Sequence, residues 1–105
     1  MKNGGIGKVI KFDSDTAGTK LIFIGNFTAV NGLSRVQAAM ADLTTTPATL
    51  SNWSTTFYTS VCSNSFDSYL RDVDMSEDGS YAVAVTTGSY GGANSSCDTI
   101  ARFET

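Results

Sequence analysis

Short apolar runs separated by turns rich in Gly, Asp and Ser recur along this chain. The run 21–24 is unbroken and stops at a glycine, a pattern typical of a strand that is buried on both faces. Residues 70–75 alternate apolar and polar side chains, and the Asp78-Gly79 pair that follows favours a tight hairpin. Other strands are predicted at 9–12, 81–85 and 99–103, with 50–58 as a candidate for one more. The pattern therefore predicts an all-β protein.

Residues 33–43, with the sequence LSRVQAAMADL, are the one segment that departs from this pattern. They contain good helix formers, and Ser34 is a candidate N-cap, so the segment taken alone predicts a helix. Helix propensity is a weak preference that tertiary context overrides. A comparison of the chain with itself argues for a strand instead.

Two parts of the chain align as an internal repeat. FDSDTAGTKLIFIG falls on MSEDGSYAVAVTTG at an offset of 63, which places Phe12 on Met75. After a longer loop in the first copy, MADL at 40–43 falls on IARF at 100–103, at an offset of 60. Because the second copy has the pattern of a strand there, we expect a strand around Met40 as well.

Each copy holds three short strands in meander order, and the first also has the candidate fourth strand around Trp53. Antiparallel units of this size are typical of β-propeller blades. We expect antiparallel meander sheets forming about one and two-thirds propeller-type blades, the first at 1–60 and the second, incomplete, at 61–105. Further blades of the same or another chain, for example in a homo-oligomer, would cover the exposed sheet.

The stretch FIGNFTAVNG, residues 23–32, follows the most apolar run and raises the question of whether it is a ligand-binding loop. Gly25 and Gly32 bracket it, and a glycine at each end favours a turn that needs positive φ angles. Phe27 and Val30 are then expected to pack beneath the turn. The sequence favours a structural turn over a binding loop.

Composition narrows the classes of partner. The net charge is −3 with seven Lys and Arg in 105 residues, so no basic stripe is present to neutralise nucleic-acid phosphates or anionic lipids. No apolar stretch is long enough to span a bilayer, and the start of the chain has no apolar signal region. Ser, Thr, Asn and Gly dominate the polar positions, which is common in secreted β-proteins. We expect an extracellular protein whose signal sequence lies outside this chain.

Cys62 and Cys97 are the two cysteines, and they are 35 residues apart with no histidine in the chain. Zinc sites need four Cys or His ligands, so a structural zinc site is excluded. A disulfide closing this loop would stabilise the fold by roughly 3–4 kcal/mol. Two buried thiols are the alternative.

The run IGNFTAVNG, followed by SR and MADL, resembles the delta-60-type repeat, one of the β-propeller repeats of bacterial exported proteins. RDVDMSEDGSYAVAVTTG and CDTIARFET are similar to stretches of such proteins, in which a cysteine pair brackets the same strands. The resemblance implies a propeller fold and export, and it implies no catalytic residues. The residues that match the repeat pattern are Ile24, Gly25, Phe27, Thr28, Val30, Gly32, Arg35, Ala41 and Leu43.

Candidate chemistry is limited to carboxylates. Asp13 and Asp15 in DSDTAG offer oxygen ligands for calcium, but the further ligands of an EF-type loop are missing, and a turn stabilised by an Asp side chain is the simpler interpretation. Asp72 and Asp74 share one strand face at a spacing that suits a glycosidase pair only loosely. Without histidine, no Ser–His or Cys–His pair can form. We expect no catalytic residues, metal or cofactor.

Binding is the function class that remains. Tyr90 lies in the polar segment GSYGGANSS, and Trp53 and Tyr69 are other aromatic side chains on which a sugar ring could stack. Packing within the fold is the alternative for each. Three functions stay open: a non-enzymatic extracellular scaffold that binds carbohydrate or protein, a fragment of an exported glycoside-active enzyme with its catalytic residues outside this chain, and a self-associating unit that completes a propeller ring.

Overall fold

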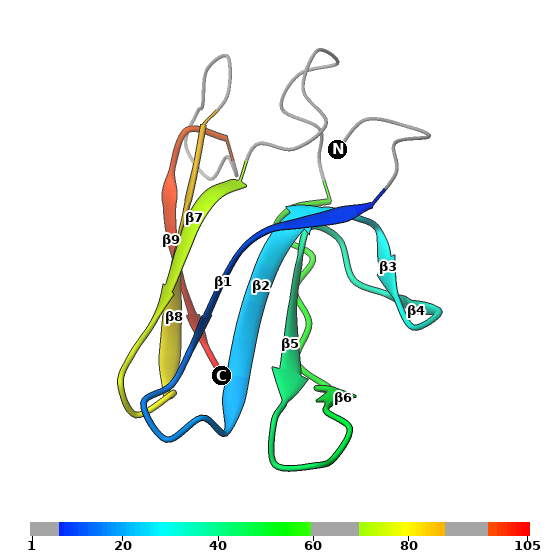
Figure 1. The fold of residues 1–105 in the computed structure, drawn as a ribbon. Helices are drawn as coiled ribbons and strands as arrows, with labels where there is room; N and C mark the ends of the chain where they lie inside the picture. Colours follow the sequence, from blue (N-terminus) through cyan, green and yellow to red (C-terminus); the bar gives the residue numbers. More distant parts are fainter. Residues whose placement is uncertain (1–6, 60–69, 88–96) are drawn as a thin grey trace.

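The computed structural model describes residues 7–59, 70–87 and 97–105, and over these ranges every regular element is a β-strand. All strand pairs are antiparallel, which confirms the prediction of an all-β fold with antiparallel sheets (Figure 1). The first unit is the sheet β1-β2-β5-β6, with β1 at Lys8–Ser14, β2 at Lys20–Asn26, β5 at Ala38–Asp42 and β6 at Thr49–Leu50. The second unit is the sheet β7-β8-β9, with β7 at Leu70–Met75, β8 at Tyr81–Thr86 and β9 at Ile100–Glu104. A small hairpin pairs β3 at Ala29–Val30 with β4 at Leu33–Ser34.

The hairpins β1–β2 and β7–β8 have the same construction. The backbone N–H of Asp15 donates to the carbonyl of Lys20, and 61 positions later Ser76 donates in the same way to Tyr81. Each turn also has a glycine with positive φ, which is 72° at Gly18 and 73° at Gly79. Each hairpin has a bulge at matching positions of its first strand. The two units are therefore equivalent at an offset of 61.

The third strands are equivalent at an offset of 62, because Ala38 of β5 pairs with Ile24 and Ile100 of β9 pairs with Val85. The offsets of 63 and 60 expected from the sequence are therefore wrong, and Phe12 corresponds to Val73 rather than Met75. Each error is two residues, the period of a strand, so the sequence comparison matched the alternation of faces without fixing the register.

The region around Met40 forms strand β5, as the repeat predicts and against the helix propensity of 33–43. Gln37 has a positive φ of 67°, which is incompatible with a continuous helix, and its carbonyl accepts a bond from Gly25 N–H at 3.0 Å. Ala38, Ala39 and Met40 are all buried. The predicted strand at 50–58 is mostly wrong, since β6 ends at residue 50 and the following residues turn inward, where Tyr58 is fully buried.

The stretch 23–32 is a strand end followed by a hairpin turn rather than a wide loop. Asn31 and Gly32 have φ angles of 51° and 79° and connect β3 to β4, as expected of a two-residue turn with left-handed residues. Gly25 lies inside β2, where it is needed for space: a side chain there would collide with the carbonyl oxygen of Lys8 in β1. Phe27 is buried against Phe23, with ring centroids 5.6 Å apart.

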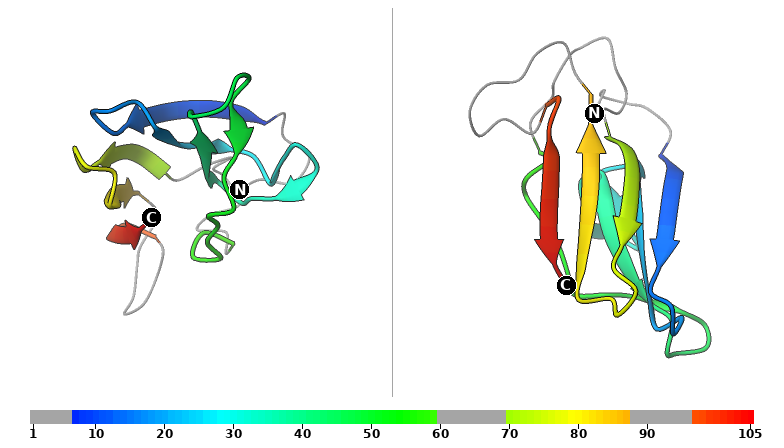
Figure 2. Two further views of the ribbon diagram at one scale, coloured as in Figure 1. Left: turned by 90° about the horizontal axis from the view of Figure 1, so that it is seen from below. Right: turned by 90° about the vertical axis from the view of Figure 1, so that its left-hand side faces the viewer.

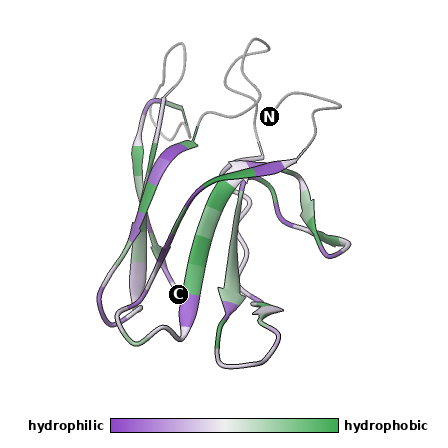
Figure 3. Ribbon diagram, in the orientation of Figure 1, coloured by the Kyte–Doolittle hydropathy of each residue, from purple (hydrophilic) through white to green (hydrophobic). Residues whose placement is uncertain are grey.

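The two units pack through opposite faces. The core contains Ile22 and Ile24 of β2 and Ala82 and Ala84 of β8. At the offset of 61 the two isoleucines correspond to Val83 and Val85, which lie on the opposite face of β8 from the two alanines. The remaining buried members of the core are Ala38, Met40, Tyr58, Leu70, Val73 and Met75. Figure 2 shows β1 running beside β7 in the same direction, with the two sheets diverging towards β5 and β9. Figure 3 shows that β2 is apolar along most of its length.

We expect Gly25→Ala to lower the free energy of unfolding by roughly 1–3 kcal/mol, because the added methyl group would press on the β1 backbone, where Val9 Cα is 3.0 Å from its position. Gly32→Asn is a matched control, since nothing lies within 4 Å of that site and asparagine tolerates positive φ. Urea denaturation measures both changes. Equal midpoints for the two variants would contradict the steric explanation.

Candidate functional site

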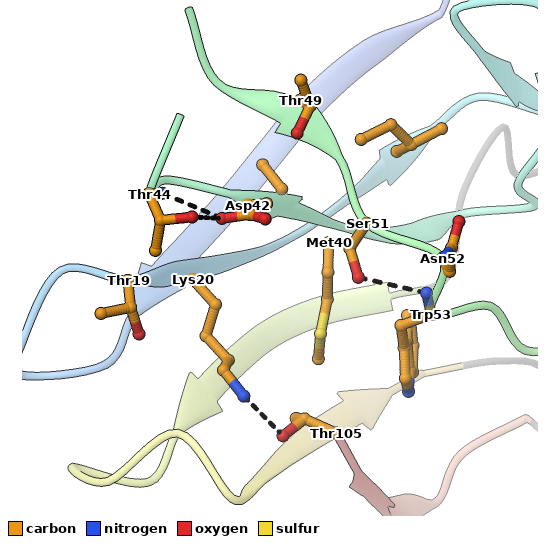
Figure 4. A pocket seen from close by; sticks show the side chains of 12 residues that line it. Thr19, Lys20, Met40, Asp42, Thr44, Thr49, Ser51, Asn52, Trp53 and Thr105 are labelled. Carbon is orange, nitrogen blue, oxygen red and sulfur yellow. Dashed lines mark hydrogen bonds between the residues drawn. The ribbon is translucent and has the colours of Figure 1, made fainter. Parts of the chain in front are cut away.

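A cleft of about 580 Å³ lies where the two units diverge, between the β5–β6 end of the first sheet and the last residue of the chain (Figure 4). Its walls come from the end of β5, from β6 and the residues after it, and from the start of β2. Most of the side chains are polar. Those used below are Lys20, Asp42, Ser51, Asn52, Trp53 and Thr105.

Asp42 is held at the wall by the turn after β5. Its carboxylate accepts bonds from the backbone N–H and the hydroxyl of Thr44, at 2.9 and 2.5 Å, and these bonds lower the pKa of Asp42. The carboxylate is therefore ionised at neutral pH. It is the one acidic side chain among the described residues that line the cleft.

Trp53 forms the opposite wall and also connects the two units. Its indole N–H donates to the carbonyl of Glu104 at 3.1 Å, and its ring lies edge-on to Phe103 at 5.7 Å between centroids. Figure 4 shows the indole across the cleft from Lys20 and Asp42. Trp53 thus packs between the units, which is the alternative to sugar stacking. Its side chain is still partly exposed and lines the cleft.

The base of the cleft is closed by a contact between the units. Lys20 Nζ donates to the hydroxyl of Thr105 at 3.2 Å, and that hydroxyl donates in turn to the carbonyl of Gly79. A positive group, a carboxylate, hydroxyl groups and an aromatic ring therefore share one open cleft. This set can bind a polar ligand by hydrogen bonds and stacking.

The acidic turns are stabilised by the aspartates themselves. Asp15 accepts bonds from the backbone N–H of Thr19 at 2.7 Å and of Lys20 at 3.1 Å, and from the Thr19 hydroxyl, which together lower its pKa. In the second unit Asp78 accepts bonds from the N–H and hydroxyl of Ser80 and from the hydroxyl of Ser76, which lower its pKa to about 2. These bonds account for the Asp residues of both turns.

Asp13 joins the two sheets. Its carboxylate accepts a bond from the backbone N–H of Met75 at 2.7 Å, which lowers the pKa of Asp13, and its hydrogen bond with Asp74 raises the pKa of the latter. In the part of the chain that the structure describes, no three or more His, Cys, Asp or Glu side chains gather into a group that could hold a metal ion. The hydrogen bonds of Asp13 to Met75 and of Asp15 to Thr19 and Lys20 give both carboxylates structural roles.

Asp72 and Asp74 are both exposed on β7, and Asp72 accepts a bond from Val73 N–H at 2.9 Å. Asp74 shares a hydrogen bond with the carboxyl group of Asp13, which belongs to the other unit. Sequence spacing cannot find this pair, because the two residues meet only through packing of strands 61 positions apart. Neither carboxyl group lines the cleft.

Several predicted residues lie outside the described ranges. These are Tyr69, Tyr90 and Cys62. Cys97 is described and buried, and its pairing with Cys62 stays a prediction. Sequence reasoning identified Trp53 but missed Lys20, Asp42, Asn52 and Thr105. Only the Asp-x-Thr turn at Asp42 offers a local signal, since the cleft forms where the end of the chain meets the first unit.

Within the described ranges no helix is long and apolar enough to cross a membrane. Comparison with family models, curated proteins and solved structures finds no match to this chain. The resemblance to the delta-60-type repeat therefore stays a prediction from the sequence.

We expect Asp13→Ala to lower the free energy of unfolding by about 1–3 kcal/mol, because the backbone N–H of the buried residue Met75 loses its acceptor. Asp13→Asn keeps an acceptor oxygen and should cost less. Chemical denaturation at pH 7 measures both variants. An alanine variant no less stable than the asparagine variant would show that this bond between the sheets does not stabilise the fold.

Acid should weaken the fold through Asp78. Its pKa is about 2 in the folded chain against 3.8 without these contacts, so its contribution is complete above pH 3.8 and is lost as the pH falls toward 2. Asp15 and Asp42 are shifted in the same direction, whereas Asp74 is shifted in the opposite one. Asp78→Asn keeps an acceptor and removes this titration.

The measurement is the urea midpoint at a series of pH values from about 5 to 2, at constant ionic strength. The wild-type midpoint should fall more steeply than that of Asp78→Asn. Parallel curves for the two proteins would show that Asp78 does not carry the acid sensitivity.

Proposed function

We propose that this chain is a non-catalytic β-repeat module of the propeller type, which acts outside the cell as a binding scaffold. In this proposal the four-stranded sheet of the first unit and the three strands described in the second unit are its blades. The support is the equivalence of the two meanders, whose turns, glycines and bulges match at an offset of 61. Propeller blades stack in this way, with one face of each unit against the other face of the next.

The cleft beside Trp53 is the proposed binding site, and a short carbohydrate is the proposed ligand. An aromatic ring that is half exposed, facing a carboxylate and amide and hydroxyl groups, offers both a stacking surface and acceptors for sugar hydroxyls. The observation that carries the proposal is the placement of Trp53 opposite Asp42 across one cleft. Their positions are fixed by bonds to Glu104 and Thr44.

The amino-acid composition supports the proposed extracellular location. The chain carries 16% charged residues and is rich in Ser, Thr, Asn and Gly, a composition suited to a secreted protein. The predicted disulfide between Cys62 and Cys97 belongs to the same proposal, because disulfides persist in oxidising compartments.

Glycan-array screening followed by calorimetry tests the ligand. Asp42→Ala should weaken binding about 10–100-fold through loss of a charged acceptor. Trp53→Phe should weaken it about tenfold by reducing the stacking surface, while a ring remains to pack against Phe103.

Glu77→Ala is the charge-matched control, because it removes one exposed carboxylate that does not line the cleft. It should bind as the wild type does. If no glycan binds, or if Asp42→Ala and Glu77→Ala bind equally well, the carbohydrate proposal is wrong.

A further inference from the structure

Each unit leaves open one sheet face that carries exposed apolar side chains. On the first unit, Val9 is 53% exposed and Phe12 67% exposed, with Leu21 and Phe23 half-buried beside them. We call these four residues the front face. On the second unit, Ile100 is 72% exposed, and Val83 and Val85 are half-buried. We call these three the rear face.

The front face matches the surface that the second unit buries in the core. At the offset of 61, Val9 corresponds to Leu70 and Phe12 to Val73, and both of these counterparts are buried against the first unit. Leu21 and Phe23 correspond to two alanines of β8 that are also in the core. The front face therefore occupies the same position in its sheet as the surface by which the second unit contacts the first.

The rear face matches the surface that the first unit buries. Val83 and Val85 correspond to Ile22 and Ile24, and Ile100 corresponds to Ala38 at the offset of 62. All three counterparts belong to the core. Inside the molecule, the second unit therefore buries the counterpart of the front face against the first unit's counterpart of the rear face. The front face of the first unit and the rear face of the second unit stay exposed.

We infer that a second copy of this chain docks its rear face on the front face, reproducing the contact that joins the two units within one molecule. The occupant follows from the geometry, because a second copy is the partner that carries the matching surface in the matching sheet position. The contact uses different surfaces on the two partners, so it continues head to tail into a closed ring or a longer stack. This proposal is independent of ligand binding at the cleft.

A polar contact should accompany the apolar one. Asp74 is the counterpart of Asp13, which within the molecule accepts a bond from Met75 N–H on the neighbouring unit. Asp74 is exposed. In the docked pair it faces β1 of the second copy near Ser14, the counterpart of Met75. Arg102 lies on the same sheet face as the rear face, opposite Val83, and corresponds to the buried Met40 at the offset of 62. Its guanidinium stacks over the Tyr81 ring at 3.9 Å and pairs with Glu104, so this charge already has a partner when the face is covered.

The experiment measures molar mass by light scattering and sedimentation over a range of concentrations. The wild type should exceed the monomer mass of 11.1 kDa as concentration rises. Phe12→Asp blocks the front face and Ile100→Asp blocks the rear face, and each should raise the dissociation constant more than about a hundredfold because a charge would be buried unpaired. Leu33→Asp is the control for the added charge, because it replaces an exposed apolar residue of the β3–β4 hairpin that belongs to neither of the two faces, and it should still associate.

Mixing separates head-to-tail docking from a symmetric dimer. Phe12→Asp retains a rear face and Ile100→Asp retains a front face, so an equimolar mixture should form a one-to-one dimer that grows no further, while each variant alone stays monomeric. Circular dichroism confirms that both variants are folded. A wild type that is monomeric at every concentration would overturn the inference. So would dimerisation of either variant alone, loss of association in Leu33→Asp, or a mixture that stays monomeric.

Discussion

The contact between opposite faces of two similar sheets is the constraint on which the rest of this structure depends. The core combines Ile22 and Ile24 of the first unit with side chains of the second, both large, at Leu70, Val73 and Met75, and small, at Ala82 and Ala84. Each sheet face of the repeat is buried in one of the two units, so both faces need apolar side chains. The face that is buried in one unit is the face that is open in the other, and Phe12 and Ile100 are exposed for this reason.

The two turns show how one backbone geometry is kept by different side chains. In the first turn the carboxylate of Asp15 accepts the Lys20 N–H, and at the equivalent place in the second turn the hydroxyl of Ser76 accepts the Tyr81 N–H. Asp78 then binds that serine and supports it. Asp15 and Asp78 are therefore explained by hydrogen bonding within the turns. An acidic motif in a chain of this kind is weak support for a metal site.

Strand periodicity made much of the fold predictable, and it also explains the errors. Alternation and the internal repeat identified the meanders and overrode the helix propensity around Met40, but a shift of two residues preserves alternation, so the register was missed. The bond from Met75 to Asp13 and the pairing of Asp13 with Asp74 depend on packing between units and have no signal along the chain. For the candidate site, the sequence pointed to Trp53 alone.

The cleft lies near corresponding positions of the two units. In the first, Asp42 of β5 pairs with Thr49 of β6, and its counterpart in the second is Glu104 of β9. At that position the indole N–H of Trp53 donates to the Glu104 carbonyl. In the first unit β5 is thus bonded by a strand, and at the corresponding position β9 is bonded by a side chain of the first unit. The proposed site lies beside this contact, so the indole that offers a stacking surface is held in place by the second unit.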